Sequence, residues 1–456
     1  MTIHPTYRFT AAALSLTALF SGCDAIVRNS TDPSITSPVE MAVFEGGYGI
    51  DWHQKIAGQF NEANGAQGIH VNLWGDPRVI EKVKPRLLRG DPPDLMIMNH
   101  LPIWRLVAAG KLAPLNEALD KPLPGDDRPW RERFIPGTLN TYTSDGQVYA
   151  IPSAFGAYTC WYDARLFREH GWAPPKTWAE FEALCESIKA AGIAPLAFQG
   201  KYPIYAWWTL QTLIHRCGGL VAINRINALE PGALTHPDVV RAAGMLQKMS
   251  AEYFQKGALA MTHTESQLQF INGQAAMIFC GLWLSNEMKE STPPSFEMRC
   301  FNVPAVEGGK GNPMLFNGAG WEYVYMSSTV RHPEATLEFL RYLVSPERAP
   351  DMGRSIGVIS AMKGATPREA VTPPLQSALD MIEPAQGIFQ IRLESLLLPW
   401  RVQVMQPATA KLLAGEVTPE EYCQMLEAGV MAAKAEPDAI LPAPVLYDPI
   451  AFGEPS

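Results

Sequence analysis

Aromatic side chains are the residues of this chain whose type indicates a chemistry most clearly. The sequence of 456 residues contains 12 tryptophans. A pyranose has apolar C–H faces, against which flat rings pack, and an edge of hydroxyls that polar side chains can bond. The rings that we expect to contact such a ligand are Phe155, Tyr158, Trp161, Tyr205, Trp207, Trp283, Trp321 and Trp400. For each ring, packing in the core is the alternative interpretation.

Polar side chains in predicted loops are the matching candidates for the edge of a sugar. They are Glu45, Tyr48, Asn99, His100 and Asn317. Glu45 and Tyr48 belong to a glycine-rich segment that follows the first predicted strand. Such glycines can bind phosphate, but the G-x-G-x-x-G pattern fails because position 52 is tryptophan. We therefore expect a backbone that approaches a ligand closely, with a solvated turn as the alternative.

Motifs for catalysis or metal binding are weak in this sequence. Residues 353–357 match G-x-S-x-G, a motif that needs a strand before its serine and a helix after it. Here a helical pattern precedes Ser355 and a strand pattern follows it, so the order is reversed. The sequence contains no H-E-x-x-H motif, no P-loop and no clustered His/Cys spacing. We expect no catalytic residue, no bound metal and no cofactor.

Net charge and the first residues bear on partners and location. A formal charge of −9 without long charged runs argues against nucleic acid as a partner. The apolar run at 9–20 is too short to span a bilayer, so residues 1–22 are expected to be a signal peptide. Residues 19–23 resemble a lipobox, which implies lipidation of Cys23 and anchoring to the cell membrane, in the periplasm or at the cell surface. An ordinary secretory signal is the alternative.

Alternating strand and helix patterns predict an α/β fold. Residues 41–44 and 69–73 are predicted strands, and the helix between them carries apolar residues at helical spacing. A strand–helix–strand order implies a parallel sheet covered by helices. Other helices are expected at 79–89, 178–190, 333–344 and 419–433. Other strands are expected at 95–98, 275–280 and 321–326, and a loop of small residues at 314–320.

The segment 145–167 organises the rest of the chain. Asp145 and Gly146 are typical of a hairpin turn. The strand pattern at 148–151 is expected to stop at Pro152, which cannot donate to a sheet ladder. A second strand at 159–162 then leads into a helix near Asp163. Such a change of strand suits a chain that crosses between two lobes, and a hairpin within one sheet is the alternative.

Six cysteines remain besides Cys23, and none has C-x-x-C spacing. An exported protein could pair some of them, and the sequence does not choose among the pairings. We expect them to be small buried hydrophobic residues.

Several of these segments together resemble one protein family. The run from Asp145 to Phe167 and its continuation at 171–181 are similar to the inter-lobe crossing of bacterial extracellular solute-binding proteins, family 1, the maltose-binding type. Residues 92–94 and 273–283 resemble further motifs of that family. Residues 44–49 with 85–94 resemble the subgroup that binds N-acetylglucosamine or diacetylchitobiose.

This resemblance implies a periplasmic-binding-protein fold of type II, with two α/β lobes joined by three crossings. The expected lobes are residues 40–151 with 305–356 and residues 152–304 with 357–456, after a tether at 23–39. The resemblance also implies a monomeric, non-enzymatic component of a sugar ABC importer. Such a protein binds sugar between its lobes and delivers it to the transmembrane permease by hinge closure. Trp283 and Trp400 resemble ring positions of the family's sugar-binding members.

Other functions remain open on the sequence alone. An extracytoplasmic enzyme acting on glycans would turn the sugar over, and a sensor component would present it to a membrane receptor. A sugar phosphate would require arginine or helix N-termini at the site.

Overall fold

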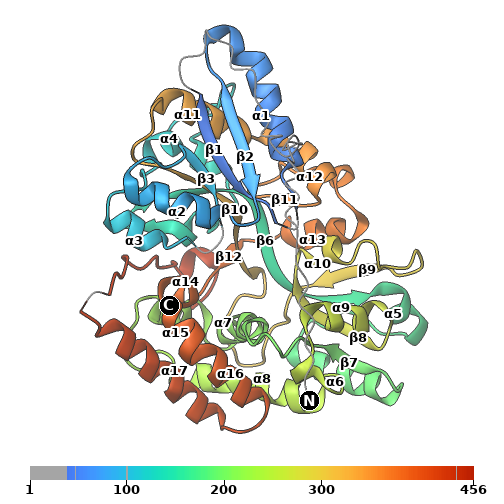
Figure 1. Ribbon diagram of the computed structural model, residues 1–456. Helices are drawn as coiled ribbons and strands as arrows, with labels where there is room; N and C mark the ends of the chain where they lie inside the picture. Colours follow the sequence, from blue (N-terminus) through green and yellow to red (C-terminus); the bar gives the residue numbers. More distant parts are fainter. Residues whose placement is uncertain (1–37, 47, 99–100, 438, 456) are drawn as a thin grey trace, which may run out of the picture. The chain divides into compact units, whose positions relative to one another are not determined.

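The structure is a computed structural model that describes residues 38–46, 48–98, 101–437 and 439–455. These residues form a mixed sheet covered by helices (Figure 1). The predicted signal peptide, Cys23 and all but the end of the tether lie outside the described residues, as do Asn99 and His100. No described helix has the length and apolar content needed to cross a membrane.

The first sheet region consists of three short parallel strands. In this region β1 lies between β2 and β3 and runs parallel to both. The strands are β1 (Val39–Phe44), β2 (Val71–Asp76) and β3 (Leu95–Ile97). The covering helices are α1 (Asp51–Asn64), α2 (Val79–Arg89), α11 (Pro333–Leu343) and α12 (Ala349–Ile356). The predicted strand–helix–strand order is confirmed by β1, α1 and β2, whose two strands are parallel. The apolar spacing of α1 buries Ile56 and Phe60 against this sheet.

Two long antiparallel strands continue the sheet beyond the first region. They are β6 (Ala150–Asp163) and β10 (Leu315–Met326). The first half of β6 pairs with β10, and its second half pairs with β8 and β9 instead. One strand therefore passes from the first sheet region to the second (Figure 1).

Two predictions on these strands are wrong. Pro152 does not end a strand, since it pairs with Tyr323 within β6. Among the described residues, the other edge of β6 is paired only from Ala154 onward. Pro152 has no N–H to donate, and at this position it can face the unpaired part of that edge. The segment 314–320 is largely strand rather than loop, because its small residues pack closely against β6 and β12 (Gly387–Phe389).

The second sheet region lies around β8 and is covered mainly by helices. In it β8 (Ala275–Gly281) runs parallel to β7 (Ala194–Ala197), and β9 (Met298–Phe301) pairs with β6. Its helices are α5 (Ala164–His170), α6 (Trp178–Ala190), α7 (Ile204–Asn227), α8 (Pro237–Glu252), α9 (His263–Ile271), α10 (Leu284–Glu287), α13 (Pro373–Ile382), α16 (Gln406–Leu413) and α17 (Pro419–Lys434). The capping boxes predicted for α6 and α17 are both present.

Short elements connect these parts. They are α3 (Ile103–Ala108), α4 (Asn116–Asp120), β4 (Thr143–Ser144), β5 (Gln147–Val148), β11 (Ile359–Ser360), α14 (Leu393–Leu396) and α15 (Leu398–Trp400). The predicted hairpin turn is confirmed, since β4 and β5 pair across Asp145 and Gly146, whose φ values are 50° and 70°. The six described cysteines are buried and unpaired.

The last residues of the chain reach the middle of α7. At Gly219 the helix has a φ of 65° and a ψ of −169°, which interrupts its hydrogen bonding. Glu454 accepts hydrogen bonds from the backbone N–H groups of Leu220 (2.5 Å) and Asn312 (2.8 Å). Its Oε1 also lies 2.8 Å from Nε2 of His215. The carboxylate therefore supplies the acceptor that the broken helix lacks.

Candidate ligand-binding site

A cavity of about 660 Å³ opens between the two sheet regions. Its lining comes from the loop after β1, from the starts of α7 and α9, from the end of β8 and from β10. The lining residues are Phe44, Gly46, Tyr48, Gly49, Tyr205, Trp208, His263, Thr264, Gln267, Trp283, Asn286, Glu287, Met288, Trp321 and Glu322. Ligands of open α/β sheets bind at the carboxyl ends of strands, where β1 and β8 place this lining. Four of the expected residues, Tyr48, Tyr205, Trp283 and Trp321, line this cavity together.

Three tryptophans dominate one wall of the cavity. The rings of Trp283 and Trp321 are stacked, with centroids 5.7 Å apart and an interplanar angle of 24°. Trp208 meets Trp283 edge to face at 5.8 Å. At these separations the rings touch one another, so a sugar cannot lie between them. It can pack on the face of Trp321, which is 39% exposed.

Two local features place these rings. Gly281 ends β8, and a side chain at this position would collide with the ring of Trp283. Asn317 in β10 donates a hydrogen bond to the carbonyl oxygen of Trp208 (2.8 Å) and so ties α7 to the crossing strand. Asn317 was expected to bond the ligand, but its amide is buried and bonds the backbone instead. The close packing of Gly281 and Trp283 is visible in the sequence as a glycine two residues before a tryptophan.

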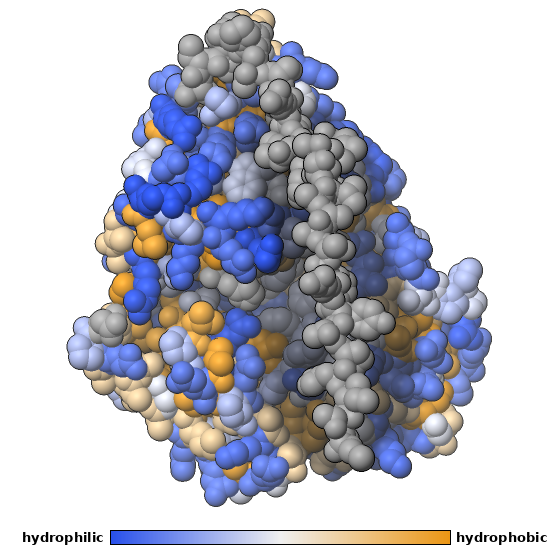
Figure 2. Space-filling model, in the orientation of Figure 1, coloured by the Kyte–Doolittle hydropathy of each residue, from blue (hydrophilic) through white to orange (hydrophobic). Residues whose placement is uncertain are grey.

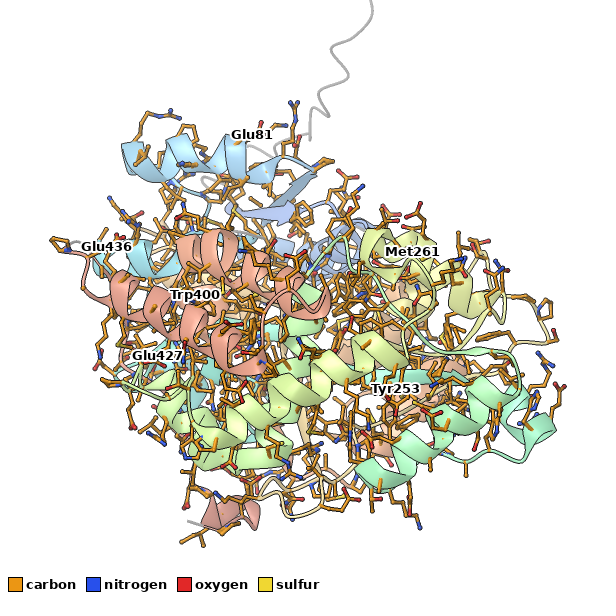
Figure 3. All side chains as sticks on the ribbon, turned by 90° about the horizontal axis from the view of Figure 1, so that it is seen from below. Glu81, Tyr253, Met261, Trp400, Glu427 and Glu436 are labelled. Carbon is orange, nitrogen blue, oxygen red and sulfur yellow. The ribbon has the colours of Figure 1, made fainter. Side chains whose placement is uncertain are left out.

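Trp161, Trp207 and Trp400 do not lie at the cavity, although they were expected to contact a sugar. Trp161 and Trp207 have no exposed surface and Trp400 has 2%. Their positions follow from packing: the indole N–H of Trp161 bonds the carbonyl of Cys280, and Trp207 packs on Trp400 at 5.7 Å. Figure 3 shows Trp400 among the C-terminal helices. These three rings belong to the core.

Three further expected residues lie beside the cavity rather than in it. Phe155 is 3% exposed and borders a small gap next to Trp283 and Trp321. The hydroxyl of Tyr158 is buried and donates toward the carbonyls of Phe279 (3.0 Å) and Tyr205 (3.1 Å). Glu45 is exposed and is absent from the cavity lining.

Trp208 is the ring that sequence reasoning missed. It is adjacent to Trp207 on α7, and successive side chains on a helix point about 100° apart. Trp207 therefore faces the core while Trp208 faces the cavity. The apolar pattern around them is too continuous to show which of the two is exposed, because 19 of the 24 residues of α7 are buried.

The polar lining of the cavity is acidic. Glu287 accepts a hydrogen bond from Nε2 of Gln267 (2.7 Å), whose side chain is buried. Burial raises the pKa of Glu322 to about 7. Burial, and then the charges of Glu322 and Glu287, raise the pKa of Tyr48 above its usual range. Among the described lining residues there is no lysine or arginine.

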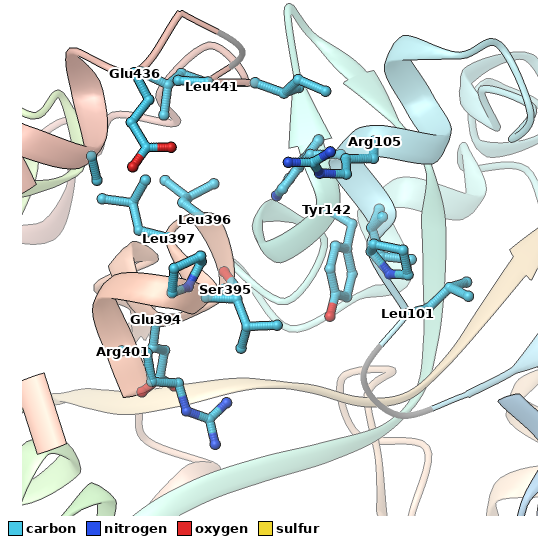
Figure 4. A pocket seen from close by; sticks show the side chains of 18 residues that line it. Leu101, Arg105, Tyr142, Glu394, Ser395, Leu396, Leu397, Arg401, Glu436 and Leu441 are labelled. Atoms are coloured by element: carbon cyan, nitrogen blue, oxygen red, sulfur yellow. The ribbon is translucent and has the colours of Figure 1, made fainter. Parts of the chain in front are cut away.

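A second cavity of about 390 Å³ lies on the other side of Trp208. The indole N–H of Trp208 bonds the carboxylate of Glu394 at 3.0 and 3.2 Å. Because Trp208 lines the first cavity and Glu394 the second, this pair forms a shared wall. Figure 4 shows Arg105 and Tyr142 facing the segment of Leu396 and Leu397 across the second cavity.

Apolar surface accompanies this second cavity. Hydrophobic side chains gather over α14 and α15 on the face seen in Figure 2. Leu398, in α15, lines this cavity and is 47% exposed. A charged ligand would gain little from this surface, whereas an apolar face of a longer ligand could pack on it.

The described residues offer no support for metal or serine chemistry. They include no group of three or more His, Cys, Asp or Glu side chains placed to hold a metal ion. Ser355 is exposed on α12, and the strand β11 follows it rather than preceding it. The order of elements is therefore the reverse of a nucleophile elbow, as the sequence indicated.

Comparison with known proteins identifies the family. Residues 46–350 match the sequence profile of a family described as "Bacterial extracellular solute-binding protein", which is more than half of the chain. The chain belongs to this family. The resemblance seen in the sequence is thereby confirmed.

The chain is similar in sequence to two proteins that are named for binding sugars. It is 26% identical over 366 residues to the Diacetylchitobiose binding protein NgcE of Streptomyces coelicolor, covering 78% of this chain and 76% of that protein. It is 25% identical over 334 residues to the Multiple sugar-binding protein of Streptococcus mutans, covering 71% and 74%.

Solved structures confirm the fold of this solute-binding protein. A chitin oligosaccharide binding protein superposes with a TM-score of 0.70 at 24% identity, covering 88% of this chain and 99% of that one. The two-lobe, type II fold expected from the sequence is confirmed. The first and second sheet regions correspond to the two lobes, with β6 and β10 between them. The lobe boundaries remain a prediction.

Proposed function

We propose that this solute-binding protein binds a mono- or oligosaccharide in the 660 Å³ cavity and delivers it to the permease of an ABC importer. The observation that carries the proposal is the wall formed by Trp208, Trp283 and Trp321, with polar groups around it. Flat rings bind the apolar faces of pyranoses, and carboxylates and amides bond their hydroxyls. The names of the two relatives, which bind diacetylchitobiose and multiple sugars, support the same ligand class.

The position of the cavity suggests how binding is signalled. Tyr48 comes from the loop after β1 in the first lobe, whereas Trp283 follows β8 in the second. A ligand that contacts both lobes stabilises the closed arrangement relative to the open one. The strands β6 and β10 connect the lobes and are the natural place for hinge bending. A permease could then recognise the closed, loaded protein.

The proposed place of action is outside the cytoplasm, at the membrane. Lipidation of Cys23 after removal of residues 1–22 would hold the carrier close to its transporter, because a diacyl anchor gives durable attachment. The protein is proposed to act as a monomer that performs no covalent chemistry. A glycan-acting enzyme is the competing hypothesis, and the presence of Glu287 and Glu322 in the cavity makes it worth testing.

A thermal-shift screen tests this proposal. The chain from residue 23 onward, with Cys23→Ala to prevent lipidation, is heated with N-acetylglucosamine, chitobiose, maltose, cellobiose, raffinose and glycerol phosphate. A sugar that binds only the folded state raises the midpoint, by about 2.7 kcal/mol of stabilisation at a hundred times the Kd. We expect a rise with at least one sugar, which is recovered intact. Breakdown of the sugar would favour the enzyme, and no shift with any sugar would contradict sugar binding.

A further inference from the structure

The charged groups of the cavity limit the kind of sugar that fits it. Two carboxylates line it, those of Glu287 and Glu322, and no described lining residue is lysine or arginine. His263 is the one described lining side chain of a basic residue type. Anionic sugars, such as sugar phosphates or uronic acids, would meet negative charge there without a compensating cation.

Glu287 is held in place by a buried amide. Gln267, which is 1% exposed, donates from Nε2 to Glu287. Its carbonyl oxygen Oε1 is buried and has no hydrogen-bond partner within the part of the chain that the structure describes. An unpaired buried acceptor is costly, so a ligand that donates to it would be favoured.

Glu322, in β10, is a half-buried acceptor that lines the same cavity. Within the described residues no hydrogen bond or ion pair satisfies its carboxyl group, and burial alone sets its raised pKa. Its backbone has a φ of 48°, a left-handed conformation that is unusual for a residue with a side chain. Ser153 donates to its carbonyl oxygen (3.1 Å) and helps to hold that conformation. Strained residues of this type cluster at binding sites.

The three acceptors line one cavity together with Tyr48. The charges of both glutamates also contribute to the raised pKa of Tyr48. Trp283 and Trp321 border the same cavity. An ammonium group has three N–H donors, and a cation is also attracted to the faces of tryptophan rings.

We propose that the bound sugar carries a free ammonium group, as an unacetylated hexosamine unit does, and that Glu287, Glu322 and Gln267 together hold that group. This inference rests on the proposed function, because it specifies the sugar that the same cavity binds. An N-acetylated sugar has one amide N–H in place of three charged donors. It would bring no positive charge to the two carboxylates.

Calorimetric titration with two matched sugars tests the inference. The mature chain with Cys23→Ala is titrated with β-1,4-linked diglucosamine and with its di-N-acetylated form, at low and high salt. We expect the free amine to bind about tenfold more tightly or better, since hydrogen bonds to charged groups are the stronger ones. Its affinity should fall with added salt, while that of the acetylated sugar should not.

Substitutions locate the effect in the cavity. Glu322→Gln and Glu287→Gln keep the shape of the side chain and remove its charge, so each should reduce the preference for the amine about tenfold. Glu416→Gln, in an exposed position between α16 and α17, is the matched control and should leave the preference unchanged. Unfolding midpoints without ligand show whether each variant is folded.

The outcomes separate this inference from the function on which it rests. Equal or tighter binding of the acetylated sugar by the unsubstituted protein would overturn the ammonium site and leave sugar binding intact. Failure of both sugars, together with the neutral sugars of the thermal-shift screen, would overturn both proposals. A preference for the amine that survives both glutamine substitutions would also overturn the assignment of these residues.

Discussion

Two glutamates, Glu454 and Glu322, show opposite uses of a carboxylate that is at least partly removed from water. Burial alone would raise the pKa of Glu454, but the neighbouring His215 and the backbone N–H groups of Asn312 and Leu220 outweigh it and lower the pKa. Glu322 has no such partners among the described residues, and burial raises its pKa to about 7. The first carboxylate is satisfied by the chain itself and stabilises the fold. The carboxylate of Glu322 has no such partner among the described residues and is available to a ligand in the cavity.

The protonation states of the Glu454 network follow from its geometry. Arg216 donates to Nδ1 of His215 (2.7 Å), which leaves Nε2 to carry the proton that faces Glu454. Burial lowers the pKa of His215 to about 4, so the imidazole is neutral at neutral pH. The contact is therefore one between a neutral imidazole and a carboxylate. It holds the C-terminal segment against the interrupted helix α7.

Removal of the Glu454 carboxylate should have the largest effect on stability. Glu454→Ala leaves the N–H groups of Leu220 and Asn312 without an acceptor and removes the carboxylate beside His215. We expect the free energy of unfolding to fall by about 3–5 kcal/mol, because each buried donor left without an acceptor costs about 1–3 kcal/mol. Urea denaturation measures the change, and Glu416→Gln, an exposed control, should give less than about 0.5 kcal/mol. A change as small as that of the control would contradict the structural role.

Removal of the Trp283 ring should have the next largest effect, and it should fall on binding rather than folding. Trp283→Ala deletes a ring from the stacked wall of the cavity. We expect a loss of about 2–4 kcal/mol in sugar binding, as at other aromatic hot spots. Trp172→Ala is the control, because that ring packs on His170 away from the cavity (4.3 Å). Equal losses of binding in both variants would contradict the site.

The pH dependence of stability should have opposite signs at the two glutamates. The pKa of Glu322 rises from an ordinary value of 4.5 to about 7 on folding, so the folded state keeps its proton while the unfolded state loses it. Stability should therefore fall by up to about 3 kcal/mol as the pH rises from 4.5 to 7. Glu454 has a lowered pKa, so its contribution is present above 4.5 and is lost as the pH falls below it.

Glu322→Gln isolates the pH dependence of stability that Glu322 contributes. The variant should be more stable than the unsubstituted protein at pH 8 and nearly equal to it at pH 4.5, because glutamine does not titrate. The other titratable groups of the cavity lining, Tyr48, Tyr205, His263 and Glu287, are retained in both proteins. Denaturation curves at several pH values measure the difference. Parallel curves for the two proteins would exclude a raised pKa at Glu322.

The smallest effect is expected at Asn317. Asn317→Ala removes one hydrogen bond to the backbone of Trp208, and the cost should be about 1 kcal/mol of stability. Sugar affinity should fall modestly, because Trp208 is positioned less well rather than deleted. Urea denaturation and titration of the same variant separate the two effects. A complete loss of binding would instead place Asn317 in direct contact with the ligand.

Local structure was predictable where the signal lies within a few residues. The capping boxes at Thr177 and Thr418 and the turn at Asp145 are formed as expected. The strands β6 and β10 were not, because their pairing depends on partners more than 150 residues apart in the sequence. A proline or a run of small residues indicates a break locally, and only the partner strand decides whether the strand continues.

The candidate site was partly predictable for the same reason. Trp283 stands two residues after a glycine at the end of a buried strand, so its position could be inferred from the sequence. The sequence does not show that Trp208 rather than Trp207 lines the cavity, because this depends on which face of α7 is covered. Glu322 gave no sequence signal at all. Its unpaired carboxyl and left-handed backbone become visible only in the folded chain.

A crystal structure with the sugar that gives the largest thermal shift shows whether the tryptophan wall binds the ligand. We expect a pyranose packed on the exposed face of the Trp283–Trp321 pair, with the first lobe contacting it through Tyr48. Its polar edge should lie toward Glu287 and Glu322. Sugar bound only in the second cavity, beside Leu396 and Leu397, would contradict the aromatic site.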